Sequence, residues 1–490
     1  MNGEISRRTF LRSSLAAGAA AVVGFDTTLR GWVSAAELPR GRFALAEGFP
    51  SFDGSLLTDG ASLAAAADDY GHMVHRQPSA VLKPGSVNDV VEMVRFARRN
   101  GIKVAARGQG HSTQGQAQVE AGVVVDMSTL NAIREVNPAD ALVEGGARWI
   151  DLLQQTVPQG LTPPTLVDFI ELSIGGTLSL GGIGGQSFRH GPQVDNVLEL
   201  QVVTGEGGLV TCSPSQNQRL FDAARSGLGQ AGLVVVARVR LIPAPPGARL
   251  YQAFYSDLPA FLSDLEGLID DGRFDTVQGF AVADGAGGWL YQLETTKYFA
   301  PGGEPDDAAL LAGLSFNPGT QVAQDMTYFD YLNRLAPLVA FLRQVGAWDL
   351  PHPWVNLFLP AASAPSFIGE TLANLPAEDV GQGPILIYPF NRDKFTAPLF
   401  RVPEARHFFC FALLRNAVPP TPERAAGLVA DNRVLFERAT EVGGKRYPFD
   451  SVPMTKHDWR RHYQPAWGRL VSAKHTYDPD GILTPGQGIF

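Results

Sequence analysis

The stretch Arg107-Gly-Gln-Gly-His-Ser-Thr-Gln-Gly-Gln116 decides how the rest of this chain is interpreted. Gly108 and Gly110 can adopt backbone angles closed to other residues, so they let the main chain approach a ligand closely. His111 lies at the tip of the turn, where a neutral imidazole offers a nitrogen nucleophile. Two interpretations are open here: a turn that binds a phosphate or an aromatic ring, or a surface glycine turn that carries a histidine.

The residues before the turn have the pattern of a β-α-β unit. Residues 80–83 predict a strand and 102–106 predict the returning strand. Between them, Ser86 is a good N-cap and Gly101 a helix stop, and a helical stripe is formed by Val87, Val90, Val91, Val94 and Ala97. The histidine turn therefore follows the carboxyl end of a buried strand, which is where α/β units bind ligands. Further strands are expected over 122–126 and 141–145.

A second glycine-rich segment runs from Pro163 to Gly191. Its glycines come in pairs at 175–176, 181–182 and 184–185. Backbone N–H groups in such loops can form anion-binding nests. The segment has neither the third glycine of a Rossmann fingerprint nor the Gly-Lys-Ser/Thr of a P-loop. We therefore expect a second ligand loop, suited to a pyrophosphate in a different fold.

Asp168 stands between Val167 and Phe169, which is an apolar setting for a carboxylate. Burial favours the protonated form of a carboxyl group, and this would make Asp168 a usable base near neutral pH. The alternative is a turn aspartate that hydrogen-bonds its own backbone.

Composition narrows the function classes. The chain has 490 residues, enough for two or three domains, with an ordinary globular content of 45% hydrophobic and 18% charged residues. Its formal net charge of -9 argues against a nucleic-acid partner. Cys212 and Cys410 stand alone, without a disulfide framework. His72-Met-Val-His75 has metal-like spacing, but no further ligands accompany it, so no metal site is expected.

The N-terminus has the pattern of a twin-arginine export signal. Ser6-Arg7-Arg8-Thr9-Phe10-Leu11 precedes an apolar, alanine-rich run over 15–25, and Ser34-Ala-Ala36 offers a cleavage site. The run is too short to span a bilayer, so no stable membrane anchor is expected. Residues 1–36 are assigned to the signal and placed outside the fold, and the protein is expected in the periplasm or secreted.

The second half of the chain has a different pattern. Residues 259–268 have helical spacing, 275–298 predict two strands around a turn at 284–288, and 328–345 predict one amphipathic helix. Trp348, Trp354 and Phe358 then form an aromatic group, which is either core or the wall of a pocket for a planar ligand.

These motifs together resemble the vanillyl-alcohol-oxidase type of flavoenzymes, and most of all cytokinin dehydrogenases. Besides the histidine turn, the similarity is carried by Gly175–Ser179, Phe188–Gln193, Val210–Ser213, Gly227–Gly232, His352–Phe358, Tyr388–Arg392 and Tyr477–Phe490. The resemblance implies an α+β chain with a two-domain PCMH-type FAD-binding fold, whose substrate domain is an antiparallel sheet with helices. The implied domains are 70–246 for FAD, 247–450 for the substrate, and 451–490 as a C-terminal segment that completes the FAD domain.

The resemblance also implies the site residues. His111 would bond covalently to the 8α carbon of FAD, and Asp168 and Gln278 would be catalytic. The implied cofactor-binding residues are Ala106, Gly108, Gln109, Gly110, His111, Ser112, Gln116, Asp168, Ser173, Ser179, Ile183, Leu233, Thr484 and Gln487. The chain departs from the family pattern at Gln278, where a glutamate is expected at the mouth of the substrate channel. It also has Phe395 in place of a tryptophan and Pro453 in place of a tyrosine beside the flavin.

The function implied is that of an exported FAD-dependent oxidoreductase. It would oxidise a secondary amine of the cytokinin type, an N6-substituted adenine, to an imine that hydrolyses to an aldehyde and an amine. The electron acceptor would be oxygen or a quinone. Two alternatives stay open: a related covalent-flavin oxidase that acts on an alcohol or a sugar, and a flavin-bearing protein that only captures its ligand.

Overall fold

The histidine turn follows the edge strand of a small, mainly parallel sheet. The computed structural model describes residues 22–34, 37 and 44–490, and this four-stranded sheet has the order β3-β4-β6-β5. Strands β4, β6 and β5 are parallel, and helix α3 (Val87–Asn100) makes the crossover from β4 to β5. The strands are β3 (Ser55–Leu57), β4 (Ala80–Lys83), β5 (Val104–Arg107) and β6 (Val123–Asp126). The predicted β-α-β unit is confirmed, and Gly101 ends α3 with a left-handed φ of 63°.

A five-stranded antiparallel sheet packs beside it, in the order β11-β10-β12-β8-β7. Its middle strand is buried on both faces, because Val235 packs toward α3 while Ala237 packs toward the other side. That other side is covered by α4 (Trp149–Thr156), α5 (Ile174–Leu180) and α7 (Gln218–Ala224). The strands are β7 (Ile133–Asn137), β8 (Asp140–Glu144), β10 (Val197–Val203), β11 (Leu209–Cys212) and β12 (Leu233–Arg240), with the two-residue pair β9 (Leu161–Thr162) and β13 (Ile242–Pro243) nearby.

The second half of the chain builds an eight-stranded antiparallel sheet, in the order β17-β14-β16-β15-β19-β20-β18-β21. The predicted strand pair over 275–298 is confirmed as β15 and β16. The strands are β14 (Gly247–Tyr255), β15 (Thr276–Ala283), β16 (Trp289–Phe299), β17 (Val322–Thr327), β18 (Val355–Pro360), β19 (Ile385–Asn391), β20 (His407–Leu413) and β21 (Lys445–Arg446).

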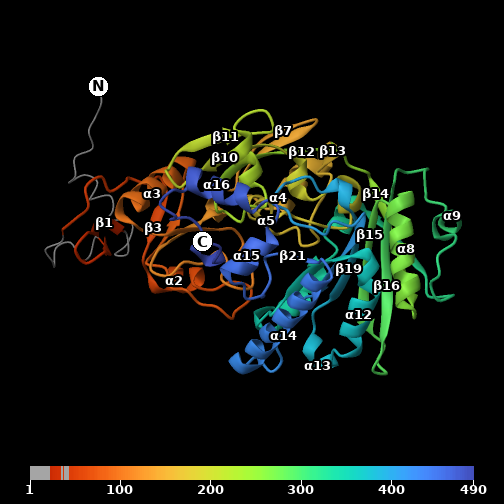
Figure 1. Ribbon diagram of the computed structural model, residues 1–490. Helices are drawn as coiled ribbons and strands as arrows, with labels where there is room; N and C mark the ends of the chain where they lie inside the picture. Colours follow the sequence, from red (N-terminus) through yellow and green to blue (C-terminus); the bar gives the residue numbers. More distant parts are fainter. Residues whose placement is uncertain (1–21, 35–36, 38–43) are drawn as a thin grey trace.

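The two faces of this sheet belong to two different cores, because side chains alternate along each strand. Phe409 and Phe411 face helices α8 (Leu258–Asp271), α12 (Ala364–Ala373) and α14 (Pro422–Glu441), which cover one side of the sheet (Figure 1). Phe408 and Cys410 face the half of the molecule that carries the histidine turn. Both cysteines are buried free thiols. The sheet thus separates an outer helical layer from the inner site.

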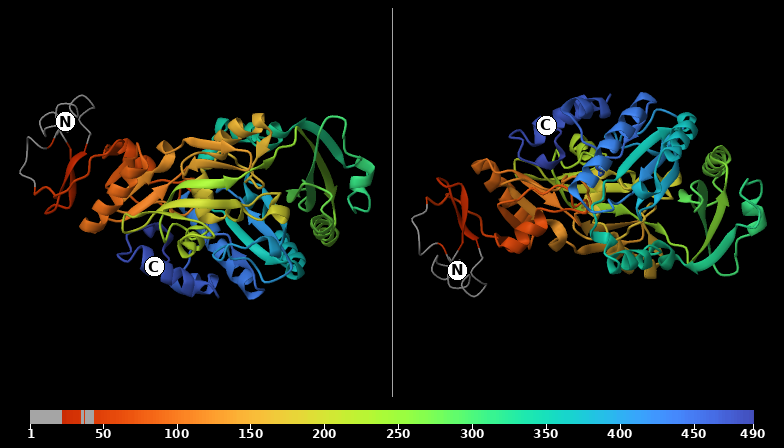
Figure 2. Two further views of the ribbon diagram at one scale, coloured as in Figure 1. Left: turned by 90° about the horizontal axis from the view of Figure 1, so that it is seen from above. Right: turned by 90° about the horizontal axis from the view of Figure 1, so that it is seen from below.

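The C-terminal segment returns to the first sheet. Helices α15 (Lys456–His462) and α16 (Trp467–Tyr477) lead to a tail that adds to β5: Val104 N donates to Ile482 O at 2.9 Å, and Thr484 N donates to Val104 O at 2.8 Å. Figure 2 shows this segment, in dark blue, beside the N-terminal half from two sides. The domain boundaries at 246 and 450 stay predictions.

The predicted single helix over 328–345 is wrong. The structure has α10 (Tyr328–Leu332) and α11 (Ala336–Gln344), with a break that contains Arg334. Pro337 explains the break, because its ring has no N–H and clashes with the carbonyl four residues earlier in a continuous helix. The smaller helices are α2 (Gly60–Ala66), α6 (Ser187–His190), α9 (Asp307–Leu311) and α13 (Ala377–Val380).

Two segments that the export-signal assignment placed outside the fold, 22–26 and 31–34, are strands in the structure, and the boundary of the signal at residue 36 stays a prediction. Strands β1 (Val22–Asp26) and β2 (Gly31–Ser34) form a hairpin whose Phe25 and Trp32 rings lie 4.9 Å apart. Phe25 also lies 6.0 Å from Phe96 of α3. These apolar side chains bury part of the surface of α3. The proposed cleavage site at Ala35-Ala36 lies outside the described residues, as do the twin arginines. Within the described residues, no helix has the length and apolar content needed to cross a bilayer.

Candidate functional site

The His111 ring lies in a stack of aromatic rings at the end of β5. Its centroid is 4.1 Å from that of Tyr70, with 27° between the planes. The opposite side of Tyr70 stacks on His352 at 4.0 Å. Burial, followed by repulsion from His352, lowers the pKa of His111 to about 3. The imidazole is therefore neutral at neutral pH, which is the form that a nucleophile requires.

A buried carboxylate, Asp69, fixes the turn in this position. It accepts hydrogen bonds from Gly71 N at 3.0 Å, Gly115 N at 2.7 Å and Ser112 Oγ at 3.2 Å. Only 2% of Asp69 is exposed, and this burial raises its pKa to about 6 although the hydrogen bonds oppose the shift. Ser112 and Gly115 of the turn are thus tied to one side chain that sequence reasoning did not identify.

Segments that are distant in the sequence meet closely at this turn. A Cβ atom on Gly108 would lie 2.0 Å from Ser173 Oγ, and one on Gly486 would lie 2.4 Å from Gly115 O. A Cβ atom on Gly229 would lie 2.7 Å from Thr484 Oγ1. The histidine turn, the start of α5, the loop before β12 and the C-terminal tail therefore share one small region.

Only some of the implied cofactor-binding residues lie together at the histidine turn. Those in the turn, Gly108, Gly110, Ser112 and Gln116, lie together with Ser173, the N-cap of α5, and with Thr484. Ala106 lies on β5, and Gln109 is exposed. Ser179 lies within α5, where its hydroxyl donates to Gly175 O at 2.8 Å, and Leu228 N donates to Ser179 O. Ile183 is half-buried, and Leu233 is buried at the start of β12. The expected glycine loop is partly helical, because residues 174–180 form α5.

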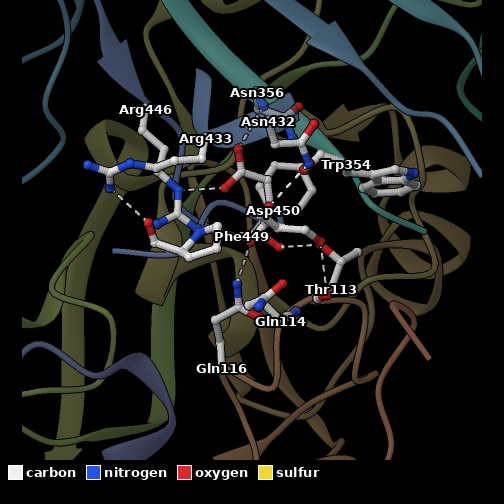
Figure 3. Close-up of polar contacts among 12 residues, drawn as sticks. Thr113, Gln114, Gln116, Trp354, Asn356, Asn432, Arg433, Arg446, Phe449 and Asp450 are labelled. Carbon is white, nitrogen blue, oxygen red and sulfur yellow. Dashed lines mark hydrogen bonds and ion pairs between the residues drawn. The ribbon is translucent and has the colours of Figure 1, made fainter. Parts of the chain in front are cut away.

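Asp450 forms a second buried junction beside the turn (Figure 3). Arg446 Nε donates to its Oδ1 at 2.5 Å, and Asn356 N donates to its Oδ2 at 2.7 Å. Gln116 Nε2 donates to the Asp450 carbonyl at 2.9 Å. This network joins the histidine turn to the eight-stranded sheet through β18. It was not predicted, because its members are far apart in the sequence.

Unpartnered buried atoms around the turn fit a large polar and aromatic cofactor. Among the residues that the structure describes, Gln114 Oε1, Trp354 Nε1 and Gln487 Oε1 are buried without a hydrogen-bond partner. Buried polar atoms normally have partners, so these three are available to a bound group. Together with the close-lying glycine backbones and the aromatic rings beside His111, they suit a flavin dinucleotide.

Asp168 lies in a polar cluster, which corrects its expected apolar setting. Its Oδ1 accepts hydrogen bonds from Gln278 Nε2 and Arg334 Nη2, both at 2.8 Å. Its Oδ2 accepts one from Tyr388 Oη at 2.9 Å. The apolar neighbours in sequence misled the prediction, because β15, β19 and the break before α11 bring the polar partners. The backbone-turn alternative does not describe these contacts either.

Gln278 is a partner of Asp168 and is not at the mouth of an open channel. Only 1% of it is exposed, and it lies on β15 directly opposite Glu294 of β16. Its Oε1 accepts a hydrogen bond from Arg334 Nη2 at 2.8 Å. Burial and then the charge of Asp168 raise the pKa of Tyr388 well above its usual value, so Tyr388 remains a phenol that donates. The sequence contains no local pattern that would have identified Arg334 or Glu294.

The predicted aromatic group divides into two parts. Trp348 and Trp354 lie 4.8 and 5.2 Å from Tyr70, beside His111. Phe358 instead packs 5.5 Å from Phe408 in the core between the sheets. Phe395, which replaces the expected tryptophan, belongs to that same core.

The pair His72 and His75 contacts one carboxylate, Asp68, at 2.7 and 3.5 Å. In the part of the chain that the structure describes, no group of three or more His, Cys, Asp or Glu side chains is arranged to hold a metal ion. Pro453, which replaces the expected tyrosine, uses its carbonyl to accept a hydrogen bond from Arg433.

Comparison with known proteins agrees with this geometry. Residues 281–490 match the family model "Cytokinin dehydrogenase 1, FAD and cytokinin binding", and 78–213 match "FAD binding domain". Residues 4–24 match the twin-arginine translocation signal.

Relatives cover nearly the whole chain. An uncharacterized oxidoreductase from the fasciation locus of Rhodococcoides fascians is 40% identical, over 88% of this chain and 97% of its own length. Cytokinin dehydrogenase 5 of Oryza sativa subsp. japonica is 39% identical, over 89% of this chain and 91% of its own length. Cytokinin dehydrogenase 1 of Arabidopsis thaliana is 36% identical, over 91% and 83%.

Proposed function

Because the chain belongs to the cytokinin dehydrogenase family of FAD-dependent oxidoreductases, we propose that its substrate is a secondary amine of the N6-substituted adenine class. The family assignment confirms the α+β, two-domain PCMH-type fold and excludes the alternative of a ligand-capturing protein without enzymatic activity. The twin-arginine signal directs export to the periplasm or beyond. The substrate is a small molecule, and its exact identity is the proposal.

Residues of the histidine turn would hold the cofactor. His111 is the proposed attachment point for the 8α carbon of FAD, which is supported by its neutral imidazole and its place at the end of β5. Ser173, Thr484 and Gln487 would contact the cofactor from α5 and the tail. FAD, when bound, supplies the acceptor for a hydride.

Asp168 would bind the substrate amine and receive its proton. A carboxylate has about four acceptor positions, two on each oxygen. Gln278 and Arg334 occupy the two positions of Oδ1, while Tyr388 occupies one position of Oδ2. The remaining position is therefore on Oδ2. A substrate N–H donated to this atom would place the reacting C–N bond at the base.

The proposed reaction balances as follows. The substrate carbon next to nitrogen loses a hydride, its nitrogen loses a proton to Asp168, and a C=N double bond forms. Water then adds to this imine, which separates into an aldehyde and an adenine with a free amino group. Tyr388 holds Oδ2 in place as the proton arrives. Oxygen or a quinone would afterwards take the two electrons.

The observation that carries the proposal is the single open acceptor position of Asp168. It is tested by mixing the holoenzyme with N6-isopentenyladenine, simple alcohols and sugars without oxygen while flavin absorbance is followed. We expect the adenine to bleach the flavin and Asp168→Asn to slow bleaching roughly 10²–10⁴-fold, the usual contribution of a positioned base. Rapid bleaching by an alcohol or sugar, with none by the adenine, would establish the alternative substrate class. Reoxidation by oxygen and by a quinone, compared afterwards, identifies the acceptor.

A further inference from the structure

We propose that Arg334 is a positioning residue that keeps Asp168 ionised and leaves Oδ2 as the atom facing the substrate, with Glu294 balancing its charge from the other side. The inference rests on the proposed function, because it assigns how the substrate-binding carboxylate is prepared. Arg334, Glu294 and their pairing are outside the motifs that the sequence analysis identified.

Arg334 reaches this position because the helix is interrupted. It lies in the break between the end of α10 and the start of α11. Its Nη2 donates to Asp168 Oδ1 and to Gln278 Oε1, both at 2.8 Å. Its guanidinium carbon lies 4.6 Å from the centroid of Tyr331. The ring and two polar partners fix the orientation of the planar cation.

The other edge of the guanidinium is held by Glu294. Arg334 Nε donates to Glu294 Oε1 at 3.2 Å. The two side chains are 15% and 11% exposed, so solvent screens this pair little. Burial opposes the charge of Arg334, but Tyr331 and the carboxylates of Asp168 and Glu294 raise its pKa well above the usual value. Arg334 is therefore a cation at neutral pH.

The charges in this cluster depend on one another. Asp168 and Glu294 contact the same cation, so without it two like charges would share a poorly hydrated site, and one of them would take up a proton. A protonated Asp168 cannot accept the proton of a substrate amine. Removing Glu294 has the opposite effect, because the whole charge of Arg334 then acts on Asp168.

Gln278 fits this arrangement as a neutral bridge. Its amide donates to Asp168 and accepts from Arg334, which an amide can do at the same time and a carboxylate cannot. A glutamate at this position would add a third negative charge beside one guanidinium. The neutral amide of Gln278 therefore suits the charge balance around Arg334.

The test is the pH profile of anaerobic flavin reduction by N6-isopentenyladenine in three single variants. The acid limb is the part of the profile where the rate falls toward low pH. Arg334→Gln should move the acid limb to higher pH by roughly 1–3 units, the usual effect of one close charge. Glu294→Gln should move the same limb to lower pH. Arg334→Lys keeps the charge and should restore most of the position of the limb, although it loses the second hydrogen bond.

Arg249→Gln is the matched control. Arg249 of β14 is 18% exposed and also bridges two carboxylates, Asp325 of β17 at 2.5 Å and Asp307 of α9 at 2.9 Å. It should leave the acid limb unchanged. Thermal unfolding and binding of adenine by calorimetry, measured on the same proteins, separate altered protonation from altered folding.

The position of the acid limb in the variants supports or overturns the proposal. Arg334→Gln with a lower rate at all pH values and an unmoved limb would reduce Arg334 to a structural residue and overturn the proposal. If that variant does not fold, an unmoved limb in Glu294→Gln overturns it equally. Failure of the proposed function looks different, because wild-type flavin would then not be bleached by the adenine, or Asp168→Asn would be fully active.

Discussion

Two single residues, His111 and Asp168, have opposite electrostatic surroundings. Burial between aromatic rings removes the charge of His111, whereas Asp168 accepts a hydrogen bond from the buried cation Arg334. The first could be anticipated from a histidine in a glycine turn. The second could not, because Val167 and Phe169 are its only neighbours in the sequence, while its partners come from positions more than a hundred residues away.

The covalent attachment is tested at His111. Acid-precipitated wild-type protein should keep its yellow colour, whereas His111→Ala should release its flavin into the supernatant, because the proposed bonding nitrogen is absent. The exposed His475 of α16 provides the control, and His475→Ala should keep its colour. Colourless wild-type precipitate would rule out covalent attachment and leave non-covalent FAD.

Asp69 gives the turn a pH dependence of known sign. Burial raises its pKa from 3.8 to about 6, so between these two pH values the folded state holds a proton that the unfolded chain has lost. The stability from this group is present below pH 3.8 and is lost as the pH rises through 6.

We expect Asp69→Asn to gain in free energy of unfolding relative to wild type over this interval, by on the order of 3 kcal/mol. Asparagine cannot ionise, and its single amide oxygen can still accept from Gly115 N. Urea unfolding of both holoproteins at a series of pH values gives this difference. A difference that is constant with pH would show that Asp69 does not titrate in this window.

At the scale of elements, the site depends on where strands and helices end. The strand before the histidine turn, its crossover helix and the pair β15–β16 could be predicted, because period and capping residues are local properties. The break at Arg334 was missed because apolar spacing continues across it, although Pro337 was a usable sign. The hairpin β1–β2 was missed because its residues were attributed to the export signal.

The C-terminal tail is an element that closes the turn. Gly486 allows the tail to pass within contact distance of Gly115, so Gly486→Ala should push it away and weaken FAD binding at least tenfold, or about 1.4 kcal/mol. Fluorescence titration of apoprotein with FAD measures this loss. Gly468 in α16 has open space around its Cα, so Gly468→Ala should bind FAD normally. Equal affinity in both variants would show that the tail does not support the cofactor.

At the scale of the whole molecule, the cofactor region is assembled from both ends of the chain. The tail adds to the β5 edge from about 380 residues further along the chain, as shown by the bond between Val104 N and Ile482 O. A chain of this kind suits export in the folded state, which the twin-arginine route provides.

Arg7→Lys combined with Arg8→Lys should therefore leave the protein in the cytoplasm with flavin bound, because folding and cofactor binding precede transport. Fractionation and flavin absorbance of the cytoplasmic pool give both quantities. Undiminished export of this double variant would show that another route is used.

The proposed reaction cleaves the C–N bond of an N6-substituted adenine through its oxidised imine. It is tested most directly by one anaerobic turnover of the holoenzyme with N6-isopentenyladenine, followed by quantification of adenine and aldehyde. We predict equal amounts of adenine, aldehyde and reduced flavin. Reduced flavin without release of adenine would show that the enzyme does not cleave the C–N bond.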